Sequence, residues 1–392
     1  MKKNIKFSIY SFYLLFLLTF TIYIGVKPYY NMDMLPYAAI LLKMEGGKTP
    51  EQIHQTTYAE AKQHLSTQHF ADLSRGSDYR AEIYEDAAAF DEQLAFYIIK
   101  PLYVAGSYLS YQAGASLPFA TALPSLLSFF IIGLLILWWM DKILPYPWLT
   151  LWICLFIITS EPLVEIGKIS APDAPAMMFL LIAAYLYVEK QSYWKSTIFF
   201  VLAILTRPDY IILVFFIFLI SLAGKWYRKV SLSHWAGGML LLLGAYLLPK
   251  LFLENVAWYT LFYHTFIERV AFPVSDPPVM QVSDYLQALK NNLMPRSFFA
   301  RSYLLLIAFF AGTTLRQPIR HLHLDIRKWS FNQLFMLALL ITMVVRFLLF
   351  PAFFDRFMAP FLLLTFFIFL RDTYPGFELI YRKYKRRSPV SI

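Results

Sequence analysis

Charged residues and cysteines are both scarce in this chain of 392 residues. Lysine, arginine, aspartate and glutamate together make up 15% of it, whereas hydrophobic residues make up 59%. A soluble globular domain carries about 25% charged residues, so the composition excludes an ordinary water-soluble protein. The one cysteine, Cys154, lies in an apolar run. It excludes an internal disulfide and a metal cluster built from several cysteines.

A basic stripe of the kind that binds nucleic acid is also missing, although the formal net charge is +10. The lysines and arginines lie between apolar runs rather than among aromatic residues along one face. Apolar runs close to the length that crosses a bilayer, about 20 residues, recur from end to end. The sequence therefore predicts a single all-α, polytopic membrane domain over residues 1–392, surrounded by membrane lipids, with no nucleic-acid partner.

About ten membrane-crossing helices are expected. Their approximate ranges are 7–26, 117–139, 147–164, 174–188, 196–206, 210–224, 232–251, 298–315, 331–350 and 354–371. The first follows three lysines and lacks a small-residue cleavage site, so we read it as an uncleaved span with a cytoplasmic N-terminus. Ten crossings place the basic tail, 372–392, in the cytoplasm as well, as the positive-inside rule requires. The expected location is a bacterial inner membrane.

The segment 94–111 could change this count. It is apolar enough to pass for a further crossing, but counting it would invert every later loop and place the basic tail outside. We therefore expect a helix that lies in or dips into the outer face of the membrane and is broken near Pro101.

A long polar segment, 27–116, separates the first two expected spans and predicts an extracytoplasmic cap with its own interfacial helices. One helix is expected to begin after Thr49, because threonine suits the N-cap, Pro50 the first helical position and Gln52 the third. A second extracytoplasmic segment, 252–297, contains no long apolar run.

Two residues of this second segment, His264 and Glu268, stand four positions apart. That spacing permits a metal pair, but it is more typical of a contact between neighbours on a helix surface. We therefore expect these two side chains on a helix surface rather than at a metal.

Several charged residues stay close to the apolar runs, although a charge at mid-bilayer costs roughly 2.5–3.5 kcal/mol. In the predicted topology they collect at the outer ends of the spans: Asp33, Lys100, Glu165, Lys168, Asp173, Arg207, Asp209, Arg346, Asp355 and Arg356. Charges near span ends often only reach the headgroups, and for Glu165, Lys168 and Arg346 this alternative stays open. Asp33 is short and lies among aromatic and aliphatic residues, so headgroup contact explains it less well.

A carboxylate beside cations at the outer membrane face suits a reaction on a lipid-linked phosphate. The cations neutralise the departing phosphate, and the carboxylate accepts a proton from the incoming hydroxyl or amine. Glycosyl transfer from a polyprenyl phosphate needs these two parts, because the bond between sugar and phosphate is already activated. Asp33 would be the base, or would hold a metal that orients the substrates.

Four short motifs carry charged residues in this region: Asp33 in NMDMLPY, Lys100 in FYIIKPLY, Asp173 in SAPDAPAMMFLL and Arg356 in DRFMAP. In their order and shared sidedness they resemble the GT-C superfamily of membrane glycosyltransferases, which includes protein O-mannosyltransferases and the lipid A aminoarabinose transferase. The matching family features are an early catalytic acid, a Lys-Pro-Pro-Leu segment, an Asp-Ala-Pro-Leu signature and an Arg-Tyr-x-x-Pro motif in the last helix.

The resemblance implies a GT-C-like bundle and an inverting transfer of a sugar from a polyprenyl- or dolichyl-phosphate donor to a lipid, glycan or protein acceptor. In that scheme Asp33 activates the acceptor, and Lys100 and Arg356 bind the lipid phosphate. Asp173 would orient the acceptor or a metal, and Arg207 in LTRPDY would be a further anion contact. A divalent ion (Mg²⁺, Mn²⁺ or Zn²⁺) would be held by Asp33 and Asp173.

Two other classes of membrane protein stay open. A lipid or glycan transporter or flippase also has broken helices and buried charges, but transporters usually show repeated halves, and a cap follows only the first span here. A polysaccharide polymerase is polytopic too, and it would rely on arginine-rich external loops. One shared site at the outer face favours the transferase, whereas a pathway open to both sides favours transport.

Overall fold

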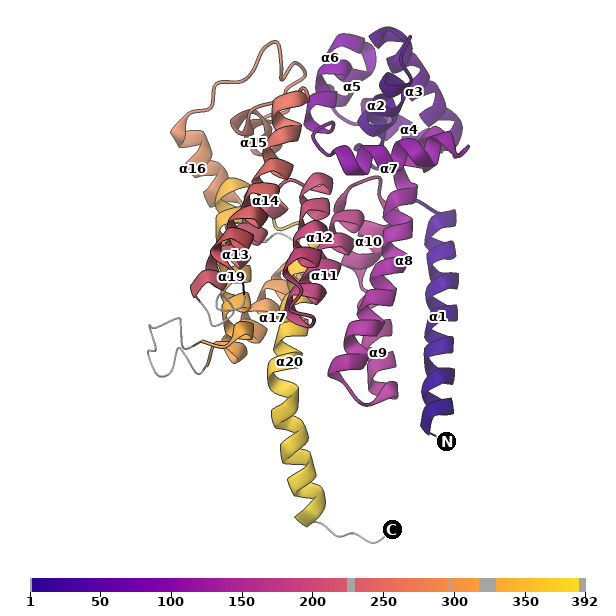
Figure 1. Ribbon diagram of the computed structural model, residues 1–392. Helices are drawn as coiled ribbons and strands as arrows, with labels where there is room; N and C mark the ends of the chain where they lie inside the picture. The colour runs from indigo at the N-terminus through magenta and orange to yellow at the C-terminus, as the bar shows by residue number, and fades with distance from the viewer. Residues whose placement is uncertain (1, 224–229, 296–297, 317–328, 388–392) are drawn as a thin grey trace.

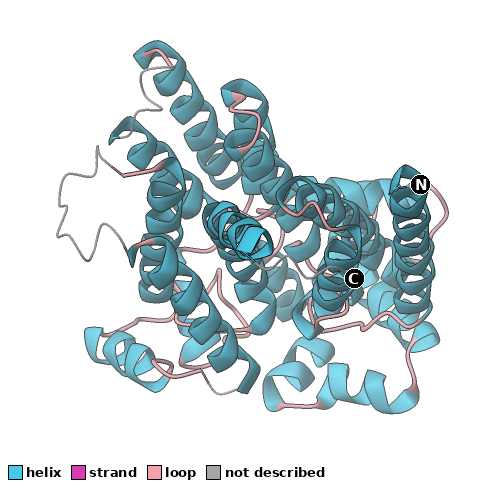
Figure 2. Cartoon of the chain, turned by 90° about the horizontal axis from the view of Figure 1, so that it is seen from below, coloured by secondary structure: helices cyan, strands magenta, loops and turns pink. Residues whose placement is uncertain are grey.

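A computed structural model describes residues 2–223, 230–295, 298–316 and 329–387 of the chain. Across these ranges the secondary structure is helical and contains no β-strand (Figure 2). The all-α architecture predicted from the composition and the apolar runs is therefore confirmed.

A helix, or in one case a bent helix pair, occupies each of the expected spans. They are α1 (Lys2–Val26), α8 (Leu117–Ile143), α9 (Pro147–Ile158) with α10 (Glu161–Lys168), α11 (Asp173–Val188), α12 (Tyr193–Thr206), α13 (Tyr210–Ala223), α14 (Leu232–Phe252), α17 (Phe298–Thr314), α19 (Phe331–Leu349) and α20 (Asp355–Arg387). Among the described residues, 5 helices are long and apolar enough to cross a membrane, or 6 if the pair α9 and α10, bent by 56°, is one span. Helices α11, α12, α13 and α17 are apolar but shorter. This pattern agrees with a polytopic membrane protein, and the number of ten crossings stays a prediction.

The break between α12 and α13 follows from the sequence LTRPDY. Pro208 has no backbone N–H to donate and disfavours helical geometry in the residue before it, so α12 ends at Thr206 and α13 begins at Tyr210. Arg207 and Asp209 consequently stand outside regular helix, between two apolar segments, from where their side chains reach neighbouring helices.

One hydrophobic core fills the space between the long helices. Helix α8 packs against α1, α9, α10 and α11, and α11 packs against α12, while α13 packs on α19 and α17 on α20. Figure 2 shows α1 at the edge of the bundle, and Figure 1 shows the start of α1 and the end of α20 on the side opposite the cap. Termini on one side are what an even number of crossings requires. Of the predicted basic tail, residues 388–392 lie outside the described part.

The first long polar segment forms a separate group of helices above the bundle (Figure 1). They are α2 (Met34–Glu45), α3 (Pro50–His64), α4 (Thr67–Arg75), α5 (Asp78–Glu85), α6 (Ala87–Gln93), a 3₁₀ turn η1 (Leu94–Phe96) and α7 (Pro101–Gln112). Helix α2 is at the centre of a second hydrophobic core, and every residue of 34–42 is buried. We call helices α2 to α7 the cap, and the end of the bundle that they cover the cap side.

Two sequence-based expectations about the cap are confirmed. Thr49 and Gln52 form a capping box at the start of α3, and Pro50 stands in its first turn. The segment 94–111 is interrupted before Pro101, where α7 begins. Helix α7 packs on α8 and lies with the cap at the upper end of that helix (Figure 1).

The second polar segment contains α15 (Trp258–Phe266) and α16 (Val282–Asn291) and is hydrogen-bonded to the cap. The Gln93 amide donates to the carbonyl of Ala271 at 2.7 Å, and the Glu92 carboxylate accepts from the Val274 N–H at 2.7 Å. These contacts join two segments that are about 180 positions apart in the sequence.

The expectation of a surface contact between His264 and Glu268 is wrong. The His264 side chain is buried, and its Nδ1 accepts a hydrogen bond from the Val270 N–H at 3.1 Å. Its ring packs edge-on against Tyr79 of the cap, 5.2 Å between centroids. Burial lowers the pKa of His264 to about 4. The spacing of four residues did not reveal this tertiary packing, which joins α15 to the cap.

Candidate functional site

The loop that carries Asp33 is fixed by backbone contacts before any side chain is considered. The N–H of Tyr29 donates to the carbonyl of Lys168 at 3.1 Å, which places the end of α1 beside the residues that precede α11. Those residues are held by α8 in turn, because the Thr121 hydroxyl donates to the Ser170 hydroxyl at 2.8 Å. Two of the four motifs are thereby brought side by side.

Asp33 lies directly before α2, and three side chains contact its carboxylate. The Asn31 amide donates to Oδ2 at 2.8 Å, and the Tyr97 hydroxyl donates to Oδ1 at 3.0 Å. The Arg356 guanidinium, at the start of α20, forms an ion pair with Oδ2 at 3.6 Å. The Asp33 side chain is 25% exposed, so it stays reachable from outside the protein.

Lys100 stands at the junction of η1 and α7, and its ammonium group lies over two aromatic rings. The ring centroids of Tyr97 and Tyr37 are 4.9 and 5.5 Å from its nitrogen. Among the residues that the structure describes, the Lys100 ammonium makes neither a hydrogen bond nor an ion pair. Burial lowers the pKa of Lys100 to about 8, although the negative charge of Asp33 opposes this change. Its donors are therefore available to an anion.

Asp173 belongs to a chain of ion pairs that runs across four helix ends. It pairs with Arg207, which also reaches Asp209 at 2.8 Å. The second oxygen of Asp209 faces the Arg346 guanidinium at 3.2 Å, and Arg346 donates to the carbonyl of Phe357 at 3.3 Å. The side chains of Arg207, Asp173 and Arg346 are at most 12% exposed. These arginines form a buried network rather than contacts with lipid headgroups, which settles the open alternative for Arg346.

The Phe357 ring connects this network to Asp33. The guanidinium carbons of Arg207, Arg346 and Arg356 lie 4.2, 4.7 and 5.1 Å from its centroid. Arginine planes stack favourably on aromatic faces, so one ring supports three cations. Through these contacts the structure brings together Asp33, Lys100, Asp173, Arg207 and Arg356, the residues singled out from the sequence.

Among the residues that the structure describes, ion pairs join Arg207, Arg346 and Arg356 to the carboxylates of Asp33, Asp173 and Asp209. Arg207 donates to two carboxylates, so little of its capacity is left for another anion. Lys100 has no carboxylate partner, and Arg356 holds Asp33 only through a long ion pair. These last two side chains are best placed to bind a phosphate.

The sequence makes Asp33 and Asp173 candidate metal ligands. In the structure the Asp33 carboxylate faces Arg356, and the Asp173 carboxylate faces Arg207. Across the described ranges no group of three or more His, Cys, Asp or Glu side chains comes together. Arginine beside each carboxylate does not fit a divalent-metal site, which takes several oxygen ligands free of competing cations.

Three contacts of the site were not expected from the sequence. Tyr97 is one of 27 tyrosines, and nothing in its neighbourhood marked it as the donor to Asp33. Asn31 is two residues before Asp33, a spacing at which a side-chain amide can reach a carboxylate. Phe357 follows Arg356 directly in DRFMAP, so its position in a charged motif was the available signal.

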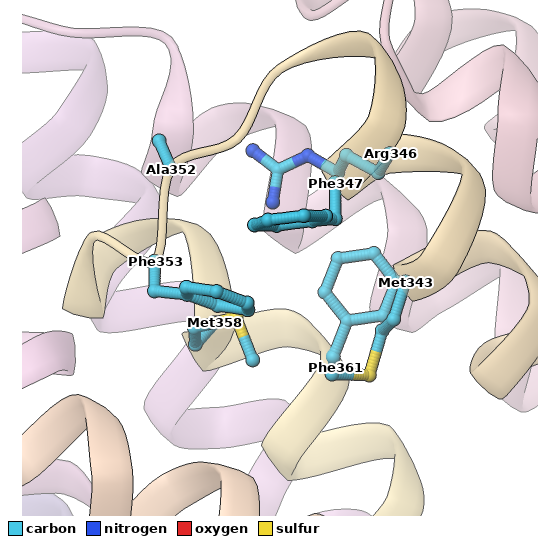
Figure 3. A pocket seen from close by; sticks show the side chains of 7 residues that line it. All are labelled: Met343, Arg346, Phe347, Ala352, Phe353, Met358 and Phe361. Atoms are coloured by element: carbon cyan, nitrogen blue, oxygen red, sulfur yellow. The ribbon is translucent and has the colours of Figure 1, made fainter. Parts of the chain in front are cut away.

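A small cavity adjoins Arg346, between the end of α19 and the first turns of α20 (Figure 3). Its lining residues are Met343, Arg346, Phe347, Ala352, Phe353, Met358 and Phe361. The volume is about 10 Å³, close to the minimum that one water molecule needs. This is a packing void beside the ion-pair network, too small for a sugar or a lipid phosphate.

Comparison of the chain with protein-family models, with curated proteins and with solved structures finds no match. Function is therefore inferred from the side chains of this site and from the order of the four motifs. Both concern the same small region on the cap side of the bundle, where charged side chains lie at the ends of apolar helices.

Proposed function

We propose that this protein is a membrane glycosyltransferase that moves a sugar from a polyprenyl-phosphate-linked donor to a lipid, glycan or protein acceptor at the extracytoplasmic face. One observation carries the proposal. The carboxylate of Asp33, oriented by Tyr97, lies in the same cluster as Lys100 and Arg356, two cations with capacity to bind an anion. A base and an anion clamp are the two parts that this transfer needs.

In the proposed reaction the acceptor hydroxyl or amine gives its proton to Asp33 as its oxygen or nitrogen attacks the anomeric carbon of the sugar. The bond between that carbon and the phosphate oxygen breaks, and the electron pair leaves with the polyprenyl phosphate. A single displacement from the opposite face inverts the anomeric configuration. Lys100 and Arg356 neutralise the additional negative charge that the phosphate gains.

The ion pairs around Asp209 would support this reaction by holding its parts in place. Arg207 and Arg346 both contact the ring of Phe357, and that ring contacts the guanidinium of Arg356. A guanidinium held in advance loses little conformational freedom when the phosphate binds. We assign Asp173 to the orientation of Arg207 and of the acceptor side of the site.

The substitution Asp33→Asn tests the proposal. It keeps the size of the side chain and its hydrogen-bond acceptor for Tyr97, but it removes the base, so sugar transfer should fall by about 10²–10⁴-fold. The matched control is Asp91→Asn, a partly exposed cap carboxylate paired with Lys43 at 3.2 Å, which should leave transfer unchanged.

The assay uses full-length protein in membranes and follows the release of polyprenyl phosphate from lipid-linked sugars. The sugar is first identified by comparing the envelope glycans and lipids of cells with and without the protein. A transporter or flippase would move the intact lipid-linked sugar and release no polyprenyl phosphate. Full transfer activity in Asp33→Asn would remove this residue from the mechanism.

A further inference from the structure

Helix α16, in the second cap-side segment, leaves several large apolar side chains uncovered. Val282 and Leu286, four residues apart on one face, are 76% and 57% exposed. Val279 before the helix and Met294 after it, 87% and 75% exposed, extend the apolar surface at both ends. Exposed apolar clusters of this kind mark contact with a membrane or with another protein.

A second exposed face of α16 is polar and is turned away from the first. Gln287 and Asn291 are exposed, and the Gln287 amide donates to the Asn291 side-chain oxygen at 2.9 Å. At 100° per residue, Asn291 lies about 180° from Val282 and about 140° from Leu286, and Gln287 lies about 140° and about 100° from the same two positions. Helix α16 is thus amphipathic in a way that burial inside the protein does not explain.

The remaining face of α16 holds the helix against the end of α19. The Tyr285 hydroxyl donates to the carbonyl of Leu348 at 2.9 Å, and the neighbouring Trp258 of α15 donates to the carbonyl of Leu349 at 2.9 Å. These two carbonyls belong to the last turn of α19, a helix that is long and apolar enough to cross a membrane. In the predicted topology these carbonyls lie where α19 reaches the outer face of the membrane.

We propose that α16 lies flat in the headgroup region of the membrane, with Val282 and Leu286 inserted into the acyl boundary. Tryptophan and tyrosine collect at this level in membrane proteins, and Trp258 and Tyr285 stand there together, 6.3 Å between ring centroids. An amphipathic helix with an apolar face and a polar face binds a bilayer in this orientation. The inference is independent of sugar transfer and would stand without it.

Continuity with the surface of α19 identifies lipid as the occupant. Leu348, at the end of α19, and Val344, one turn before it, are exposed on the outside of the bundle at 45% and 62%. Figure 1 shows α16 at the outer edge of the molecule beside the upper end of α19. A bilayer covers both apolar surfaces without a gap, whereas a protein partner would have to cover α16 and leave α19 to the lipid.

Site-directed fluorescence tests the proposal in the full-length protein. In a background in which the single cysteine is removed (Cys154→Ser), Leu286→Cys and the matched control Asn291→Cys are each labelled with an environment-sensitive fluorophore. The protein is placed in phosphatidylcholine–phosphatidylglycerol vesicles with or without lipids that carry a nitroxide near the headgroup. Val282→Cys provides a second position on the apolar face.

Labels at 286 and 282 should be quenched several-fold more by the nitroxide lipids than the label at 291, and should be shielded from iodide in the buffer. The label at 291 should respond mainly to iodide. Equal access of iodide to all three positions would mean that the apolar face lies in water and would overturn the proposal. Protection of 286 from both quenchers would also overturn it, because a protein surface would then cover the helix.

Discussion

Ion pairs occur at both ends of the helix bundle, and the two ends are built differently. On the side of the termini, Lys6 pairs with Asp141 at 2.7 Å and Arg371 with Glu189 at 3.4 Å. The Lys6 and Arg371 side chains are 45% and 31% exposed, and each carboxylate serves a separate arginine or lysine. On the cap side, by contrast, Asp209 is shared between two buried arginines that stack on one aromatic ring.

This contrast indicates that a contribution to stability alone does not explain the cluster of charged side chains on the cap side. A solvent-exposed ion pair contributes about 0–1 kcal/mol, and either end of the bundle could be closed with such pairs. Burying a lysine without a carboxylate partner works against folding, yet Lys100 lies over two tyrosines beside Asp33. A cation kept in that position is better explained by a ligand that brings its own negative charge.

Of the comparisons between the two ends of the bundle, the largest effect is expected for two arginines of α20, Arg356 in its first turn and Arg371 near the other end of its apolar part. Arg356→Gln removes a charged donor from the proposed phosphate site and should lower sugar transfer by about 10²–10³-fold, the effect of deleting one preorganised donor. Arg371→Gln removes the partner of Glu189 and should leave transfer near that of the unchanged protein. The transfer rate in membranes is the measurement. Equal losses of transfer in the two variants would mean that Arg356 has no specific role in the reaction.

The next comparison concerns stability and pairs two aspartates. Asp209→Asn removes the negative charge that faces the buried Arg346 and turns one of the two acceptor oxygens into an NH2 group, so Arg207 and Arg346 can no longer both donate to this side chain. Loss of one member of a buried pair costs about 3–5 kcal/mol. Asp141→Asn removes the partner of the exposed Lys6 and should cost about 1 kcal/mol or less.

Unfolding of both variants in mixed detergent micelles measures these free energies. A cost of under 1 kcal/mol for Asp209→Asn would show that the cap-side network is as loosely coupled as the opposite end. A large cost for Asp141→Asn would equally remove the contrast between the two ends.

The smallest effect is a pH dependence that arises from Lys100. Burial lowers the pKa of Lys100 to about 8, so the ammonium is present below that pH and is lost as the pH rises through it. Between pH 7 and 9 the charged fraction falls about tenfold, and the KM for the donor should rise by a similar factor. Lys100→Arg stays charged throughout this range and should show a flat profile.

The exposed cap lysine Lys43, replaced by arginine, is the control for the pH experiment, and its profile should match that of the unchanged protein. A pH dependence that persists in Lys100→Arg would assign the titration to another group. A flat profile in the unchanged protein would mean that the ammonium of Lys100 does not contact the donor.

Much of the fold follows from local sequence signals. Apolar runs located the long helices, Pro208 located the break between α12 and α13, and Thr49 with Gln52 located the start of α3. The gathering of the four charged motifs was also expected, because the predicted topology placed all of them at the same ends of the spans. Their roles in a reaction and the number of crossings stay predictions.

Contacts set by tertiary packing could not be read in this way. The burial of His264 against Tyr79 joins segments far apart in the chain, and the sequence around His264 resembles an ordinary helix surface. Tyr97 could not be told from the other tyrosines of an aromatic-rich membrane protein. The apolar spacing of Val282 and Leu286 was visible, but a helix of ten residues is too short to register as an apolar run.

The pairing of Tyr29 with Lys168 is made by an N–H and a carbonyl, groups that every residue other than proline carries. Substitutions at these two positions would therefore leave the tether in place as long as proline is avoided at 29. Chains that share this architecture can therefore differ in sequence at these two positions while Asp33, four residues after Tyr29, stays in the same place in the fold. The geometry of the site can thus outlast recognisable similarity in the residues around it.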